Sequence, residues 1–167
     1  SFASVKRVGY WGPPVAGLDY STPALAIAAC AAGDSIYVYG STAGSAWVFD
    51  MDKRLVIIGT GYYYAANTPG NTIFNPNLQN YSAHSIANIN LGDGTSGSII
   101  TGIYGRIICS QSHTSPINNV RVSNIYWTGT ETMWKNGITY NNWEISKCYM
   151  QTCTIGYPNN NTATLTN

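Results

Sequence analysis

One short pattern occurs three times between Gly97 and Tyr149, and it limits the fold of this chain more than any other feature. The three copies are Ser98–Tyr104 (SIITGIY), Val120–Tyr126 (VRVSNIY) and Trp143–Tyr149 (WEISKCY). Ile100, Val122 and Ile145 hold the same place in the pattern, and the offsets between them are 122 − 100 = 22 and 145 − 122 = 23. A β-type pattern with a period near 22 is typical of the stacked coils of a solenoid, and not of a closed barrel or a sandwich.

Within a coil of parallel strands, alternate side chains point inward, and equivalent positions of neighbouring strands stack about 4.8 Å apart. The pattern predicts two buried columns: Ile100, Val122 and Ile145, and Ile103, Ile125 and Cys148. Arg121 and Glu144 are predicted to be outward neighbours of opposite charge, with Lys147 close by. The corner residues are Gly102, Asn124 and Lys147, of which Gly and Asn tolerate left-handed backbone. The three tyrosines that end the copies are predicted to form a ladder.

The same period is present earlier in the chain, where the offset from Ile36 to Ile57 is 57 − 36 = 21. Short apolar or alternating runs predict further strands at Ser35–Tyr39, Ala46–Phe49, Leu55–Ile58 and Ser85–Leu91. A polar turn is expected at Asp50–Lys53. Thr128–Thr139 is expected to be an insertion at a coil corner, since loops lengthen there without disturbing the stack.

The segment 1–34 is predicted to be an N-terminal cap with one short helix. Residues 1–20 are expected to be irregular. Thr22 and Pro23 then supply a capping residue and a first-turn proline for a short helix over Ala24–Ala32, which Gly33 ends. Leu25, Ile27 and Cys30 are its partly buried positions. The predicted organisation is a cap over 1–34, whose helix covers the first open coil, followed by coils over 35–167 that continue beyond the chain.

Composition excludes several classes of function. Charged residues make up 9% of the chain and the net charge is +1, so no basic surplus is available for a nucleic-acid backbone. No run approaches the ~20 apolar residues that a membrane span needs. The 13 Tyr and 5 Trp, among many Ser, Thr, Asn and Gly, are typical of exported β-rich proteins. We therefore expect an extracellular or cell-surface location.

Four cysteines are too few for a dense disulfide framework and lack the spacing of a metal array. Cys148 replaces an isoleucine of the pattern, which favours a small core residue. A bridge from Cys148 to Cys153 is left open.

Two stretches, Pro23–Val38 and Leu55–Tyr62, carry a resemblance to a known family. The chain resembles the right-handed parallel β-helix, or pectin-lyase-like, superfamily, and is most similar to secreted or surface β-helix proteins of Bacteroidetes-type bacteria. The resemblance implies an all-β, right-handed parallel β-helix. It says little about chemistry, because this fold hosts lyases, hydrolases, adhesins and phage tailspikes.

Enzymes of the superfamily act on polysaccharides with clustered carboxylates, and its lyases also use calcium. The only such cluster here is Asp50, Asp52, Lys53 and Arg54, so these residues are the candidates if the chain is an enzyme; otherwise they form a solvated turn. His84 and His113 lack a partner at metal-ligand spacing and are expected at the surface or at corners. No catalytic residue, metal or other cofactor is otherwise predicted.

Aromatic residues suggest a binding function more than the carboxylates suggest catalysis. Exposed aromatic faces stack on sugar rings, and the candidates are Tyr63, Tyr64, Trp127 and Trp134; the alternative is that they anchor loops. We expect a non-catalytic structural or adhesive module with weak affinity for a surface glycan. The alternatives are a polysaccharide lyase or glycoside hydrolase, and a tailspike or fibre segment. The last strand is expected to pair with a continuation of the chain or with another copy, because no cap follows it.

Overall fold

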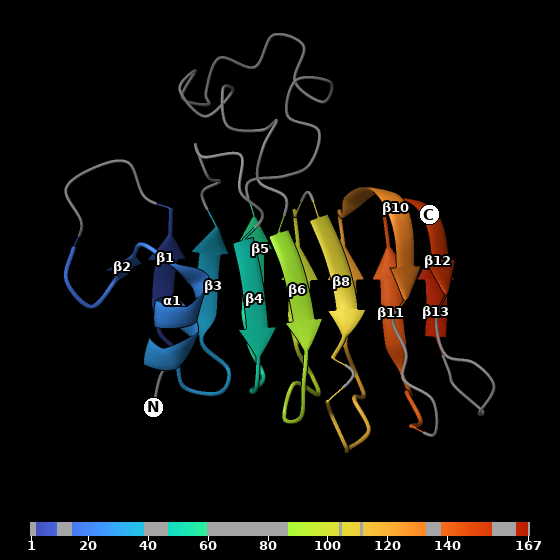
Figure 1. The fold of residues 1–167 in the computed structure, drawn as a ribbon, viewed down its shortest axis with the longest axis horizontal. Coiled ribbons are helices and arrows are strands. Elements are labelled where there is room, and N and C mark those ends of the chain that lie inside the picture. The colour runs from blue at the N-terminus through green and yellow to red at the C-terminus, as the bar shows by residue number, and fades with distance from the viewer. Residues whose placement is uncertain are drawn as a thin grey trace, which may run out of the picture.

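The computed structural model describes residues 3–9, 15–38, 47–59, 87–103, 105–110, 112–132, 138–154 and 163–166. Within them the chain is mostly strands in parallel sheets, with one helix (Figure 1). The helix is α1 (Pro23–Ala29). The strands are β1 (Val5–Val8), β2 (Asp19–Tyr20), β3 (Ser35–Val38), β4 (Trp47–Met51), β5 (Val56–Gly59), β6 (Ala87–Leu91), β7 (Ile99–Thr101), β8 (Gly105–Cys109), β9 (Arg121–Ser123), β10 (Tyr126–Thr132), β11 (Trp143–Ser146), β12 (Tyr149–Thr154) and β13 (Ala163–Thr166).

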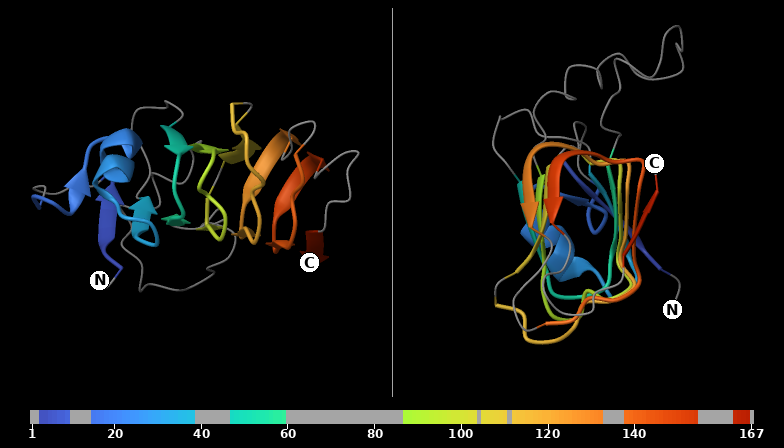
Figure 2. Two further views of the ribbon diagram at one scale, coloured as in Figure 1. Left: turned by 90° about the horizontal axis from the view of Figure 1, so that it is seen from below. Right: turned by 90° about the vertical axis from the view of Figure 1, so that its right-hand side faces the viewer.

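The longest sheet has eight strands in the order β13-β11-β9-β7-β5-β3-β1-β2, and we call it the long sheet. The even-numbered strands after α1 form a second sheet, β4-β6-β8, and a pair, β10-β12. Figure 2 shows that the colours follow one another along the long axis, so strands that neighbour in space come from successive parts of the chain. The described strands of the long sheet pair in parallel, as the repeated pattern predicts.

A column of apolar side chains fixes the register of the long sheet. Paired positions on successive strands are Ile36, Ile57, Ile100, Val122 and Ile145. All five are buried. The second predicted column is also confirmed for Ile103 and Ile125, whereas Cys148 is only partly buried. Its thiol is free, so no bridge to Cys153 forms.

The predicted corner adopts left-handed backbone in all three copies, with φ of 70° at Gly102, 53° at Asn124 and 52° at Lys147. Lysine is unfavourable in this conformation by about 1–2 kcal/mol. Its presence indicates that the neighbouring strands impose the corner on the third copy. An equivalent corner precedes the strands, where Gly97, Asn119 and Asn142 have φ of 79°, 59° and 56°.

The helix begins as predicted, because the side chain of Thr22 accepts a hydrogen bond from the backbone N–H of Leu25 at 3.4 Å. It ends at Ala29, earlier than predicted, and Lys53 Nζ donates to the carbonyls of Ile27 and Cys30 at 3.3 and 3.4 Å. Ile27 and Cys30 are buried, but the prediction for Leu25 was wrong, since 54% of it is exposed. No helix in the described ranges is long and apolar enough to cross a membrane.

The helix packs against β4, β1 and β2 and lies at the N-terminal end of the stack (Figure 1). The prediction that residues 1–20 are irregular was wrong, because β1 and β2 extend the long sheet beyond β3. Local sequence did not reveal β1, since Lys6 and Arg7 interrupt its apolar pattern. Arg7 is held by Asp19 of the neighbouring strand, through hydrogen bonds of 2.5 and 2.8 Å.

Two predicted loops are partly strand. Asp50 and Met51 belong to β4, where Met51 is buried opposite Leu91. The expected insertion over Thr128–Thr139 instead continues β10 to Thr132, which pairs with β12 across a register shift. In both cases backbone hydrogen bonds with a neighbouring strand stabilise a strand that the polar local sequence does not predict.

A glycine at the end of β5 provides a test of how closely the strands stack. A Cβ added at Gly59 would lie 2.1 Å from the carbonyl oxygen of Gly102 and 2.7 Å from Cδ1 of Ile103. Gly59→Ala should therefore lower the free energy of unfolding by about 3 kcal/mol, because backbone has to move. Gly17→Ala is the control: its φ is +75° and no atom lies within 4 Å, so only about 1 kcal/mol of backbone strain is expected. If urea denaturation gives the same loss of unfolding free energy for both variants, the close approach of Gly59 to Gly102 is contradicted.

Candidate functional site

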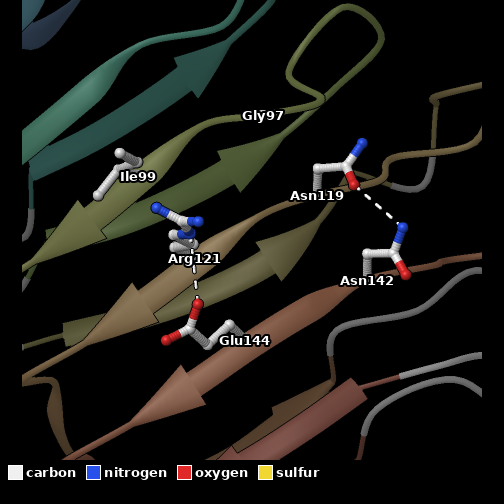
Figure 3. A pocket seen from close by; sticks show the side chains of 6 residues that line it. All are labelled: Gly97, Ile99, Asn119, Arg121, Asn142 and Glu144. Carbon is white, nitrogen blue, oxygen red and sulfur yellow. Dashed lines mark hydrogen bonds and ion pairs between the residues drawn. The ribbon is translucent and has the colours of Figure 1, made fainter.

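A shallow hollow of about 370 Å³ lies across β7, β9 and β11 on the outer face of the long sheet (Figure 3). Its lining residues are Gly97, Ile99, Asn119, Arg121, Asn142 and Glu144. We call this hollow the groove. Each of the three strand segments contributes one residue of a corner and one residue of a strand, so the groove is a direct product of the repeated pattern.

The strand positions of the groove are in register, with Ile99 opposite Arg121 and Arg121 opposite Glu144. Nε of Arg121 lies 3.3 Å from Oε2 of Glu144, and the two side chains are 67% and 52% exposed. The predicted outward ion pair is therefore confirmed. An exposed pair of this kind contributes only about 0–1 kcal/mol to stability. Within the described residues, no hydrogen bond joins the Nη atoms of Arg121 or the second carboxylate oxygen of Glu144 to another group.

The corner positions of the groove form an amide ladder. Nδ2 of Asn142 donates to Oδ1 of Asn119 at 3.2 Å, as Figure 3 shows. The backbone beneath is also tied together, because the N–H of Asn119 donates to the carbonyl of Asn141 at 2.9 Å. Sequence analysis missed both asparagines. They repeat with the period of the pattern, and extending the alignment by one position before each copy would have found them.

A row of hydroxyl side chains lies beside the groove, two positions further along the same strands. Ser123 Oγ donates to Thr101 Oγ1 at 2.9 Å, and Nδ2 of Asn124 donates to the same oxygen at 3.2 Å. The outer face of β7, β9 and β11 is thus polar on both sides of the ion pair. The side chains of Thr101, Ser123 and Asn124 are held by one another, so a ligand would have little ordering of this row to impose.

The candidate catalytic residues have different partners, apart from the contact between Asp52 and Lys53. Asp50 lies on the outer face of β4 and accepts a hydrogen bond from Nδ2 of Asn90 at 2.6 Å. Asp52 is exposed, and its Oδ1 lies 3.5 Å from Nζ of Lys53. The same Nζ donates a hydrogen bond to the carbonyl of Ile27 in α1. Arg54 is exposed, and its guanidinium lies over Gly33. Among the residues that the structure describes, no group of three or more His, Cys, Asp or Glu could hold a metal ion.

The aromatic candidates fall mostly outside the described residues. Tyr63, Tyr64 and Trp134 lie outside them, and of Trp127 only the backbone, in β10, is described. Tyr104 of the predicted ladder is also outside them. The other two rungs are stacked, since the rings of Tyr126 and Tyr149 have centroids 4.9 Å apart and planes 17° apart. Tyr149 is 56% exposed.

His113 was expected at the surface or at a corner, and its burial in the segment between β8 and β9 excludes the surface position. His84 lies outside the described residues. His113 is buried, with Nδ1 against the carbonyl of Ser110 and Nε2 2.7 Å from the hydroxyl of Tyr140. Tyr140 meets Trp143 edge-on, and Nε1 of Trp143 donates to the carbonyl of Ile117 at 2.8 Å. Nearby, burial raises the pKa of the Cys109 thiol to about 12. These groups are a satisfied core network.

None of the three comparisons, with protein-family models, with curated proteins and with solved structures, found a match for this chain. The groove and its neighbouring hydroxyl row are therefore the basis for a functional proposal.

The carboxylate of Asp93 joins the loop between β6 and β7 to the loop between β8 and β9. Hydrogen bonds from the backbone N–H groups of Ser115 and Thr114 lower the pKa of Asp93 below its ordinary value. A lowered folded-state pKa adds stability above the unfolded-state value of about 4, and this stability is lost as the pH falls through the folded-state pKa.

The difference in stability between wild type and Asp93→Asn should therefore shrink as the pH is lowered from 6 to 3, in urea titrations. Asp52→Asn is a matched control, because Asp52 accepts no backbone hydrogen bond in the described residues. A difference that grows at low pH would contradict this role of Asp93.

Proposed function

We propose that this chain is a non-catalytic, extracellular or cell-surface module, built as a right-handed parallel β-helix, which binds glycans weakly in the groove. The observation that supports the proposal most is the groove itself. It places a guanidinium, a carboxylate and two amides on the outer face of a rigid parallel sheet. A structural or adhesive module needs an outer face that is stable in solution. It does not need a reacting group.

The path of the chain supports the β-helix. From β3 to β13 the described strands alternate between the long sheet and another sheet. The crossover between successive parallel strands is right-handed in nearly all known proteins. Successive coils would then each contribute one strand to the long sheet, and the N-terminal cap would be the segment that holds α1.

The chemistry of the groove supports a glycan. Sugar hydroxyls both donate and accept hydrogen bonds, and the groove offers Nη donors from Arg121, a carboxylate acceptor from Glu144 and amide groups from Asn119 and Asn142. Because the groove is shallow and water-exposed, one site should bind weakly. Several copies on a surface would raise the effective strength through avidity.

The last strand supports a partner at the C-terminal edge. Among the described strands, β13 pairs with β11 alone, and neither β12 nor β13 contains a charged residue. Charged residues are a common protection of exposed edges. We propose that this edge pairs with a continuation of the chain or with a second copy.

The glycan proposal is tested by measuring the affinity of wild type and Arg121→Ala for a panel of soluble polysaccharides by titration calorimetry. Arg121→Ala should lower the affinity for any bound polymer about tenfold, with a melting temperature close to that of wild type, because Arg121 is largely exposed. Asn90→Ala, a polar change on the outer face of β6, is the control and should retain binding.

Failure of every polysaccharide to bind would contradict the proposal. The same polysaccharides are also incubated with wild type, with and without calcium. If one of them is broken down, and the breakdown stops in an Asp50→Asn, Asp52→Asn double variant, the chain is instead a lyase or hydrolase.

A further inference from the structure

The groove carries one positive and one negative side chain and is close to neutral as a whole. Arg121 supplies the positive charge, and Glu144 lies against it, 3.3 Å away. The other lining residues are Gly97, Ile99, Asn119 and Asn142, which have no charge. A ligand that enters the groove therefore meets a guanidinium whose charge is already balanced.

We propose that the groove selects neutral glycans over acidic ones, and that Glu144 is the residue that determines this specificity. The inference rests on the proposed glycan function and adds the class of polymer. Glu144 acts by repulsion of acidic polymers, which is a common route to specificity.

Hydrogen-bonding capacity favours a sugar hydroxyl over a sugar carboxylate. The groove offers donors on Arg121 and an acceptor on Glu144 that form no hydrogen bond within the described residues. A pair of neighbouring hydroxyls can donate to Glu144 and accept from Arg121 at the same time. An ionised carboxylate or sulfate can only accept, so it would use Arg121 and leave Glu144 facing a like charge.

The geometry also gives the direction of a bound polymer. The two rows of groove residues cross the strands, from β7 through β9 to β11 (Figure 3). Neighbouring strands are about 4.8 Å apart, so successive sugar units along this direction meet different coils. The β7 end offers the side chain of Ile99 and the bare backbone of Gly97, which suit the apolar face of a sugar ring. The β11 end offers Glu144 and Asn142.

The test compares wild type with Glu144→Gln, which removes the negative charge and keeps the shape. Glu144 is half exposed, so the variant should fold as wild type does, and a melting curve checks this. The probes are two neutral polymers, a soluble β-glucan and a mannan, and two acidic ones, polygalacturonate and alginate, at low salt. Wild type should bind a neutral polymer and bind the acidic ones at least about tenfold more weakly.

Glu144→Gln should raise the affinity for the acidic polymers about tenfold, because Arg121 is then free to bind a carboxylate, and this gain should be lost at high salt. Asp50→Asn removes the same charge from the outer face of β4, outside the groove, and should give no gain. Arg121→Ala in the Glu144→Gln background should abolish the gain.

The outcomes separate this inference from the proposed function. Wild type that prefers acidic polymers, or Glu144→Gln that gains nothing while neutral binding persists, would overturn the specificity role of Glu144 and leave the glycan function standing. A gain of equal size in Asp50→Asn would also overturn it, since net charge alone would then be the cause. Absence of binding by both proteins to all four polymers would overturn the glycan function and the inference together.

Discussion

The structure depends on the in-register stacking of one apolar column. Ile36, Ile57, Ile100, Val122 and Ile145 lie on successive strands of the long sheet and are all buried. A register shift by a single position would turn each of these side chains outward and bury the residue beside it. For the β9 and β11 segments, the residues that would be buried are Arg121 and Glu144. The same register that protects the core therefore places the ion pair in the groove.

The corners make this register possible. Left-handed backbone at Gly97, Asn119 and Asn142 on one side of the strands, and at Gly102, Asn124 and Lys147 on the other, keeps each strand short. Asparagine contributes more than conformational tolerance, since its side-chain amide reaches the neighbouring copy. Asn141 N–H donates to Oδ1 of Asn118 at 2.8 Å, and Asn142 donates to Asn119. The ladder on the groove is thus also a structural element, which explains why a binding surface can be rigid here.

Several buried polar groups of the described residues are satisfied by hydrogen bonds between residues far apart in the sequence. Ser98 is buried and its Oγ accepts the N–H of Leu55 at 3.1 Å. Both oxygens of the buried Asp34 accept hydrogen bonds from Ser4, and hydrogen bonds from that residue are the main reason why the pKa of Asp34 is lowered. Burying such groups without partners would be strongly unfavourable. These bonds therefore fix how the N-terminal residues lie against the strands that follow.

The sequence by itself determined the period, the inward column, the corner at Gly102, Asn124 and Lys147, and the pairing of Arg121 with Glu144. These follow from local alternation and from the nearly constant offset between the copies, both of which can be read along the chain. Only the tertiary structure decided the rest. β1 and the end of β10 are strands because a neighbouring strand pairs with them, and His113 is buried because Tyr140 and the carbonyl of Ser110 satisfy it. Tertiary structure also decided the groove, because its shape requires three strands to stack side by side. No single copy of the pattern contains it.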